Sequence, residues 1–147
     1  MKDKTILLIE DNPSDIELTQ RALDKGHVVN ELVVTSDGQE ALDYLFGTGA
    51  YKGRDTSDLP TLTLLDLKLP KVSGLDVLRR IRSEAKTHRM PVVILTSSVE
   101  EQDLAAGYDL GANSYIRKPV DFGQFVQSVA QLGLYWLVLN EEPPKVE

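Results

Sequence analysis

The strongest constraint on the fold is an alternation of short apolar runs with amphipathic segments. Three of these runs have the length of a strand and are almost purely apolar: Thr5–Ile9, Leu62–Leu65 and Val92–Leu95. Such runs are typical of strands that are covered on both faces. Two weaker runs, Glu31–Thr35 and Ser114–Ile116, are expected nearer the edges of the same sheet. The alternation predicts βαβ units, and therefore a parallel α/β sheet with right-handed crossovers and helices on both faces.

Capping signals predict where the intervening helices begin. The residues expected to cap them are Asn12, Asp37, Ser73, Ser98 and Asp121. Asn12 precedes a proline, which suits the first helical position. Asp37 and Ser98 are each followed three residues later by a glutamate, which is the capping-box pattern.

Two segments are expected to lie outside regular structure. The stretch Gly47–Pro60 contains three glycines and several charges, which predicts a solvated loop. The stretch Asn140–Glu147 is charged and contains two adjacent prolines, so it is expected to fray. We therefore expect a single domain over residues 1–147, with its core in 4–138 and a tail in 139–147.

Composition excludes several classes of function. The chain has no cysteine, so disulfides, thiolate metal sites and cysteine nucleophiles are absent. Its formal charge of −7 argues against nonspecific binding to nucleic acid. No apolar run approaches the roughly 18 residues that a membrane-spanning helix needs. The first apolar run is also too short for a signal peptide, which predicts a cytoplasmic location.

Polar residues follow the apolar runs at the places where each strand is expected to end. They are Glu10, Asp11, Asp66, Thr96, Ser97 and Lys118. Open parallel sheets bind ligands at the carboxyl ends of their strands, so these side chains are expected to converge. Three carboxylates on one rim repel one another, and a hard divalent cation with oxygen ligands, such as Mg²⁺, removes that conflict. An aspartate beside such a cation is suited to form an aspartyl phosphate, with the lysine offsetting the phosphoryl charge.

Each of these residues also has a structural interpretation. Asp11 is placed to cap a helix, Thr96 to occupy a turn, and Lys118 to be a solvated surface charge. Taken singly, these interpretations are the more common ones. The succession of acid pair, acid, hydroxyl and lysine at consecutive strand ends favours the functional interpretation.

Four separated motifs resemble the receiver domain of two-component response regulators. They are ILLIEDNPSD, LLDLKLPKVSGLDVL, VVILTSS and GANSYIRKPVD, and the resemblance covers roughly residues 4–138. It implies a flavodoxin-like, doubly wound sheet of five parallel strands in the order 2-1-3-4-5, with five helices. It also implies a phosphoacceptor switch that catalyses only its own phosphorylation and dephosphorylation.

The resemblance assigns a phosphoacceptor and a magnesium site. Asp66 matches the residue that takes up the phosphoryl group. Asp11 and Asp66 match the direct ligands of Mg²⁺, and Glu10 matches a neighbour that acts through water. Lys68 lies where a backbone carbonyl completes the metal shell.

The resemblance also assigns phosphate-binding and switch residues. Thr96 matches the switch hydroxyl and Tyr115 its aromatic partner. Lys118 matches the phosphate-binding lysine, and its bond to Pro119 is expected to be cis. Ser97 stands where small residues are usual and is expected to be a second phosphate donor or a steric gate.

Three further features resemble the stand-alone response regulators of phytochrome histidine kinases. They are the long Phe46–Pro60 stretch, the PTLTLLDLKLPK run and the ending Tyr135-Trp136. This resemblance implies a sensor histidine kinase of the phytochrome type as partner. No output domain is expected after the last helix, so the switch is expected to act on a partner or on a second copy. A homodimer through the fourth helix, fifth strand and fifth helix is one such output, unless the large apolar residues near Tyr135 and Leu139 pack mostly on the sheet.

Other functions fit the sequence less well. A flavodoxin-type cofactor protein needs a hydroxyl-rich or glycine-rich loop after the first strand, whereas Glu-Asp-Asn-Pro-Ser-Asp repels phosphate without a metal. A phosphatase with an aspartyl nucleophile places a second acid two residues later, where this chain has Lys68. A receiver that has lost its chemistry is not expected to keep the acids, Thr96 and Lys118 together.

Overall fold

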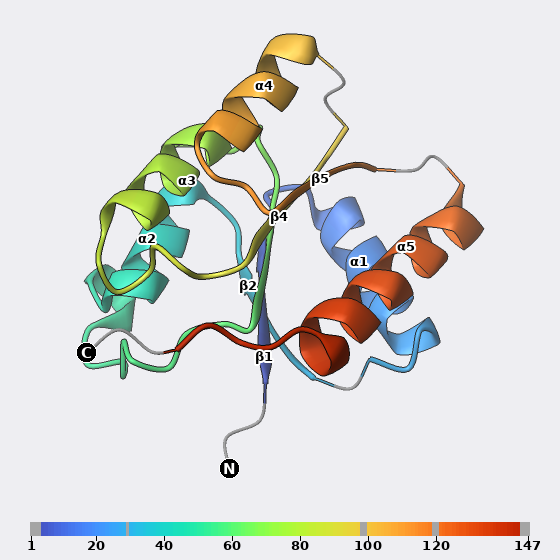
Figure 1. Ribbon diagram of the computed structural model, residues 1–147, viewed down its shortest axis with the longest axis horizontal. Helices are drawn as coiled ribbons and strands as arrows, with labels where there is room; N and C mark the ends of the chain where they lie inside the picture. The colour runs from blue at the N-terminus through green and yellow to red at the C-terminus, as the bar shows by residue number, and fades with distance from the viewer. Residues whose placement is uncertain (1–3, 29, 98–99, 119–120, 145–147) are drawn as a thin grey trace.

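The five expected strands form one parallel sheet in the order β2-β1-β3-β4-β5 (Figure 1). The computed structural model describes residues 4–28, 30–97, 100–118 and 121–144. The strands are β1 Thr5–Ile9, β2 Glu31–Thr35, β3 Leu62–Leu65, β4 Val92–Thr96 and β5 Ser114–Arg117. The two least apolar runs, β2 and β5, are the edge strands, as their composition predicts. The flavodoxin-like order 2-1-3-4-5 is confirmed.

Helices cover both faces of this sheet. They are α1 Pro13–Lys25, α2 Gly38–Phe46, α3 Gly74–Ser83, α4 Glu101–Asp109 and α5 Phe122–Leu134. Helices α1 and α5 lie against each other on one side of the sheet, and α2 and α3 lie on the other, followed by α4 (Figure 1). Among the helices of the described ranges, none has the length and apolar character needed to cross a membrane.

The core consists of two apolar layers, one on each face of the sheet. Successive side chains of a strand point to opposite faces. In β1, Leu7 and Ile9 therefore join the layer under α2 and α3, whereas Ile6 and Leu8 join the layer under α1 and α5. All four side chains are almost completely buried. Burial on both faces explains why β1 has no polar alternation in its sequence.

Four of the five predicted caps are present. The side chains of Asn12, Asp37, Ser73 and Asp121 each accept a hydrogen bond from a backbone N–H in the first turn of their helix. The fifth predicted cap, Ser98, lies outside the described residues. Helix α4 begins only at Glu101, with Glu100 at the N-cap position and no side-chain cap there. The predicted capping box therefore places the start of α4 too early.

The stretch Gly47–Pro60 is more firmly held than the predicted solvated loop. It contains a single 3₁₀ turn, Gly49–Tyr51. The Arg54 guanidinium lies 4.0 Å from the centroid of the Tyr44 ring. Its Nε donates to the Tyr44 carbonyl at 2.6 Å, and its Nη1 donates to the Asp58 carbonyl at 3.0 Å. The contacts with Tyr44 fasten the stretch to α2, and the bond to Asp58 closes the stretch on itself. No sequence pattern reveals such contacts to main-chain acceptors.

The chain after α5 also differs from expectation. A π-helical turn, Tyr135–Leu139, follows directly; it buries Leu137 but leaves Tyr135 and Leu139 exposed. The large apolar residues at this end therefore do not pack mostly on the sheet. The tail then crosses the amino ends of the strands (Figure 1), where Thr61 Oγ1 donates to Glu142 at 2.9 Å. As expected, residues 140–144 have no regular secondary structure and are mostly exposed, and the Thr61 contact links them to the sheet.

Candidate metal and phosphoryl site

Two acids are placed side by side at the carboxyl edge of the sheet because main-chain hydrogen bonds continue past the strand ends. The Glu10 N–H donates to the Thr35 carbonyl, and the Asp66 N–H donates to the Ile9 carbonyl, each at 3.0 Å. Helix α3 begins in close contact with this edge, since a Cβ on Gly74 would lie only 2.2 Å from the Asp66 carbonyl oxygen. Only glycine permits this approach, so the Gly74 position fixes how closely α3 packs beside Asp66.

The predicted acid cluster is present. Glu10, Asp11 and Asp66 each offer a carboxylate oxygen that lies within 4.8 Å of the others. Glu10 is 2% exposed and Asp66 is 9% exposed, whereas Asp11 faces solvent. Two buried acids and an exposed one, all offering oxygen, suit a hard divalent cation that retains water ligands. The donor set therefore fits the predicted metal.

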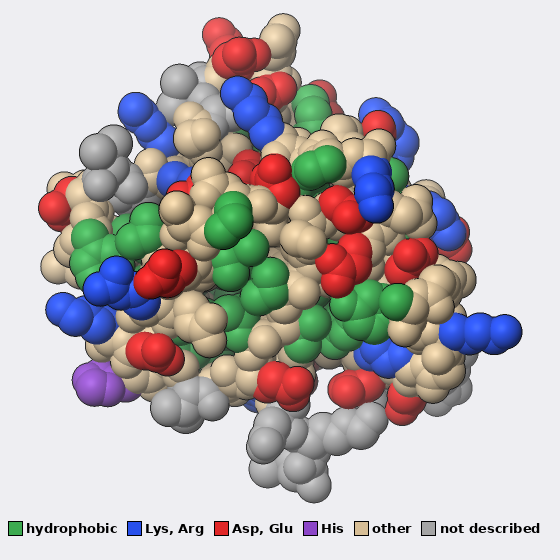
Figure 2. All heavy atoms as spheres, turned by 180° about the vertical axis from the view of Figure 1, so that it is seen from behind, with side chains coloured by type: hydrophobic (Ala, Val, Ile, Leu, Met, Phe, Trp, Pro, Cys, Tyr) green, Lys and Arg blue, Asp and Glu red, His purple; other side chains and the backbone are tan. Residues whose placement is uncertain are grey.

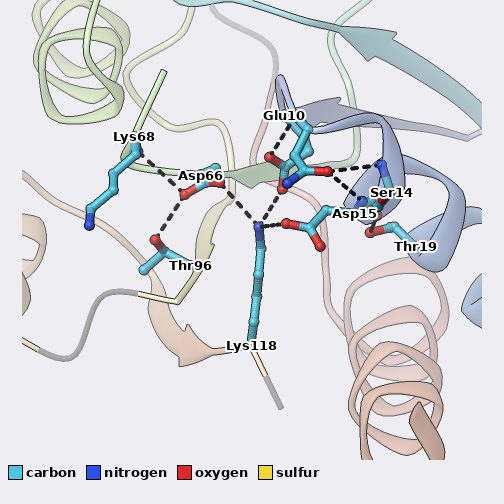
Figure 3. Close-up of polar contacts among 9 residues, drawn as sticks. Glu10, Ser14, Asp15, Thr19, Asp66, Lys68, Thr96 and Lys118 are labelled. Atoms are coloured by element: carbon cyan, nitrogen blue, oxygen red, sulfur yellow. Dashed lines mark hydrogen bonds and ion pairs between the residues drawn. The ribbon is translucent and has the colours of Figure 1, made fainter. Parts of the chain in front are cut away.

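Lys118 lies among the acids, although it comes from the far side of the site. Its backbone N–H donates to the Thr96 carbonyl at 2.8 Å, which fixes it at the end of β5. Its ammonium donates to Glu10 Oε1 at 2.5 Å, Asp15 Oδ2 at 2.9 Å and Asp66 Oδ2 at 3.1 Å (Figure 3). An ammonium group has three donors, and these three carboxylates use all of them.

The second oxygen of Asp66 is bonded from the opposite side. The Thr96 hydroxyl donates to Asp66 Oδ1 at 2.8 Å, and the Lys68 N–H donates to the same oxygen at 3.3 Å. The Lys68 side chain points away from the carboxylate (Figure 3). Thr96 and Lys118 thus hold one oxygen each, which orients the carboxylate before any ligand arrives.

The two buried acids, Glu10 and Asp66, have pKa values that are shifted in opposite directions. Burial by itself would raise the pKa of Asp66, but the Lys118 charge and hydrogen bonds from Glu10, Thr96 and Lys118 together hold it below its ordinary value. Burial raises the pKa of Glu10 to about 7, even though its hydrogen bond from Lys118 acts in the opposite direction. Asp66 is therefore ionised at neutral pH, whereas Glu10 takes up a proton as the pH falls through about 7.

Comparison with known proteins identifies the family. The chain matches the family described as "Response regulator receiver domain" over residues 6–130. It belongs to that family. Receiver domains are phosphoacceptor switches that bind a divalent metal in an acidic pocket, and this receiver domain has an acid cluster at the carboxyl edge of its sheet.

Individual relatives agree with this assignment. The response regulator Rcp1 of Synechocystis sp. is 37% identical over 134 residues, which cover 91% of this receiver domain and 89% of Rcp1. Rcp1 has been solved with Mn²⁺ bound; that structure has a TM-score of 0.86 and 35% identity, with 96% of this chain and 99% of the other covered.

Two further solved structures come from phytochrome systems. The phosphorylated cyanobacterial phytochrome response regulator RcpA has a TM-score of 0.88 and 40% identity, covering 97% of this receiver domain and 100% of RcpA. The bacteriophytochrome response regulator AtBRR has a TM-score of 0.76 and 52% identity, covering 96% and 100%. The resemblance to phytochrome response regulators is confirmed.

The structure also locates Tyr115 and Ser97, two further predicted residues of the receiver domain. Tyr115 is half-buried on β5, and its ring lies against α4, where a Cβ on Gly107 would be 3.3 Å from it. Ser97 is exposed directly after β4. Their switch and phosphate-binding roles stay predictions. The expected cis bond from Lys118 to Pro119 lies outside the described residues.

The sequence reasoning missed one residue at the site. Asp15 contacts the Lys118 ammonium from the first turn of α1, yet its position inside a helix gave it no strand-end signal. A sequence signal did exist, since α1 starts immediately after the acid pair Glu10 and Asp11. Because this helix starts at the carboxyl edge of the sheet, we expect an acid in its first turn to lie near that edge.

Proposed function

We propose that this receiver domain accepts a phosphoryl group from a sensor histidine kinase onto Asp66, with Mg²⁺ bound at the acid cluster, in the cytoplasm. One observation carries the proposal: an ionised, nearly buried Asp66 has the Lys118 ammonium on one oxygen and the Thr96 hydroxyl on the other. A nucleophile with prepositioned donors on both sides is what phosphoryl transfer requires of a protein.

The acid cluster supplies the ligands for the metal. Asp11 and Asp66 would bind Mg²⁺ directly, Glu10 through water, and the Lys68 carbonyl would complete the protein's share. When bound, the ion offsets negative charge on the phosphoryl oxygens. Mg²⁺ retains several waters and takes few protein ligands, which agrees with the exposure of Asp11.

In the transfer step, an Asp66 carboxylate oxygen forms a bond to phosphorus while the bond between phosphorus and the histidine nitrogen of the kinase breaks. The released imidazole nitrogen recovers its neutral form by proton exchange with solvent. Lys118 and Thr96 donate to the phosphoryl oxygens as charge develops on them. Attack of water on phosphorus later breaks the acyl phosphate bond, releases inorganic phosphate and restores the carboxylate, so the domain limits its own signal.

The switch follows from the bond between Thr96 and Asp66. The hydroxyl would leave Asp66 Oδ1 for a phosphoryl oxygen, with Ser97 as a second donor, and Tyr115 would fill the space behind Thr96. Reversing a two-state population from 1:99 to 99:1 takes about 5.5 kcal/mol. A few charge-assisted hydrogen bonds of roughly 1.5–3 kcal/mol each can provide this. The surface that changes is made by α4, β5 and α5.

We propose a phytochrome-type kinase as the partner, because RcpA and AtBRR are phytochrome response regulators. A homodimer through α4, β5 and α5 is supported by large apolar side chains that are exposed on this surface and its extension: Leu104, Tyr108, Leu134, Tyr135, Val138 and Leu139. Nucleic acid is not proposed as a partner. On the face seen in Figure 2, acidic and basic side chains are interspersed rather than gathered into a basic patch.

The proposal is tested with a small phosphodonor, which removes the need for the kinase. Wild type is incubated with phosphoramidate, with Mg²⁺ or with chelator, and phosphoprotein is measured by intact mass. We expect labelling that requires Mg²⁺ and is lost in Asp66→Asn. Asp24→Asn, an exposed aspartate on α1, is the matched control and should label like wild type. Labelling of Asp66→Asn at the wild-type rate would reject Asp66 as the phosphoacceptor.

A further inference from the structure

Asp15 differs from the other partners of Lys118 in one respect. Of the three carboxylates that accept from the Lys118 ammonium, Glu10 and Asp66 belong to the acid cluster that fits a metal. Asp15 contacts the ammonium at 2.9 Å but lies outside that cluster. It is 32% exposed at its side chain, whereas the Lys118 side chain is 12% exposed. The contact is therefore shielded from solvent mainly on the lysine side.

The start of α1 fixes the backbone of Asp15 through two hydrogen bonds. Its backbone N–H donates to the Asn12 side chain at 3.3 Å, within the N-cap of the helix. Its carbonyl accepts from the Thr19 hydroxyl at 2.8 Å, one turn further along. The carboxylate thus projects from a capped first turn toward Lys118, which approaches from β5 (Figure 3). This geometry gives the long lysine side chain a fixed partner on the opposite side of the site.

A divalent cation at the acid cluster changes the surroundings of Lys118. It competes with the ammonium for the oxygens of Glu10 and Asp66, and it repels the ammonium as a like charge. Asp15 lies outside the acid cluster, so a cation bound there does not compete with the ammonium for the Asp15 carboxylate. We propose that Asp15 is a positioning residue, which retains the Lys118 ammonium beside Asp66 while a divalent cation occupies the cluster. This inference rests on the proposed function.

The proposal predicts a defect at saturating Mg²⁺. Without Asp15, the flexible lysine side chain is no longer held where the phosphoryl oxygens arrive, and misplacement of a catalytic group lowers the rate of the chemical step. We expect Asp15→Ala to lower the maximal rate of phosphorylation by phosphoramidate about tenfold. Asp15→Asn keeps the size without the charge and should fall between Asp15→Ala and wild type. Asp15→Glu restores the charge and should recover most of the rate.

The experiment measures phosphorylation rates of these variants over a range of Mg²⁺ concentrations. It also follows the Lys118 ammonium by ¹⁵N NMR in unphosphorylated protein at saturating Mg²⁺, where we expect its signal to be broadened by solvent exchange in Asp15→Ala but not in wild type. Glu17→Gln is the matched control, because Glu17 is an exposed acid on the same helix and its loss changes the net charge equally. We expect Glu17→Gln to stay within about twofold of wild type, which separates a local effect from a general electrostatic one. Asp15→Ala is then introduced into a Lys118→Met background. If Asp15 acts through Lys118, the tenfold effect should shrink there to less than about twofold.

Two results would overturn the proposal. One is a maximal rate of Asp15→Ala and Asp15→Asn equal to that of Glu17→Gln. The other is an undiminished tenfold loss in the Lys118→Met background, which would mean that Asp15 acts independently of the lysine. Failure of the proposed function looks different, because it requires Asp66→Asn to be labelled in the same assay.

Discussion

At the two edges of the sheet, partly buried cationic side chains are bonded to different kinds of partner. At the carboxyl edge, Lys118 is bonded to Glu10, Asp15 and Asp66, all of them charged or titratable. At the amino edge, the Arg82 guanidinium donates to four neutral acceptors among the described residues. These are the carbonyls of Gly111 at 2.8 Å, His88 at 3.0 Å and Met90 at 2.7 Å, and the Asn113 side-chain oxygen at 2.9 Å.

This contrast separates function from stability. Neutral acceptors do not titrate, and a divalent cation does not displace a guanidinium from them. Arg82 therefore links α3 to the starts of β4 and β5 whether or not a metal is bound. The carboxyl edge holds more negative than positive groups, and a cation or a phosphoryl group redistributes their bonds. Substitutions at the carboxyl edge should therefore change ligand binding, and those at the amino edge should change the free energy of unfolding.

The largest expected effect is at the carboxyl edge. Asp11→Asn removes a proposed ligand from the exposed side of the acid cluster, and we expect Mg²⁺ affinity to fall about 100-fold, or about 2.7 kcal/mol. In chelator, the free energy of unfolding should change by less than about 0.5 kcal/mol, because Asp11 is exposed. Isothermal titration and urea unfolding measure the two quantities. An affinity within about twofold of wild type would contradict the assignment of Asp11.

The opposite pattern is expected at the amino edge. Arg82→Ala leaves several carbonyls without their donor, so the free energy of unfolding should fall by about 2 kcal/mol. The rate of phosphorylation by phosphoramidate should stay within about twofold. Arg89→Ala, at an exposed arginine nearby, is the control and should be close to neutral. If Arg82→Ala impaired Mg²⁺ binding while leaving stability intact, the division between the two edges would be wrong.

A smaller effect concerns pH. In metal-free protein the pKa of Glu10 is raised from its ordinary 4.5 to about 7, so the folded state binds this proton more tightly than the unfolded state. The resulting stabilisation is complete below the ordinary value and is lost as the pH rises through about 7. The lowered pKa of Asp66 acts only in the acid range, where its stabilisation is lost.

In chelator, we therefore expect wild type to lose about 1–2 kcal/mol more than Glu10→Gln between about pH 5 and pH 8. Urea unfolding at a series of pH values measures this difference, and Glu10→Gln cancels the contribution of all other titrating groups. Parallel curves for the two proteins would show that burial of Glu10 does not perturb its titration.

The smallest effect is expected at the tail. Glu142→Ala removes the acceptor of the Thr61 hydroxyl, and we expect a loss of about 0.5–1 kcal/mol in the free energy of unfolding. Phosphorylation should be unaffected. Glu141→Ala is the control, since Glu141 is exposed beside it. Equal stabilities of the two variants would mean that the tail contact adds nothing to the fold.

The fold and most of the site could be predicted because the relevant signals are local in sequence. Apolar runs such as Leu62–Leu65 indicated strands that are buried on both faces. Because ligands bind at the carboxyl ends of such strands, Asp66 and Lys118 were expected at the same edge of the sheet. The contacts that escaped prediction involve groups without a sequence signature. Arg54 donates to the Tyr44 carbonyl, 10 positions away, and Asp15 reaches Lys118 across 103 positions of the chain.

The start of α4 was misplaced for a related reason. Ser98 and Glu101 have capping-box spacing, but the helix begins at Glu101, so the local pattern did not decide where it starts. The sequence left open whether Tyr135 and Leu139 pack on the sheet. In the structure both are exposed, while Leu137 between them is buried.

The central claim is that this edge of the sheet transfers a phosphoryl group to Asp66 and to no other acid nearby. Its most direct test is to phosphorylate wild type with phosphoramidate and Mg²⁺, reduce the acyl phosphate with borohydride, and locate the resulting homoserine by tandem mass spectrometry. The account predicts homoserine at position 66 alone, absent when Mg²⁺ is chelated. Homoserine at position 11 or 15, 5-hydroxynorvaline (the reduction product of a glutamyl phosphate) at position 10, or labelling that persists without a divalent cation, would contradict it.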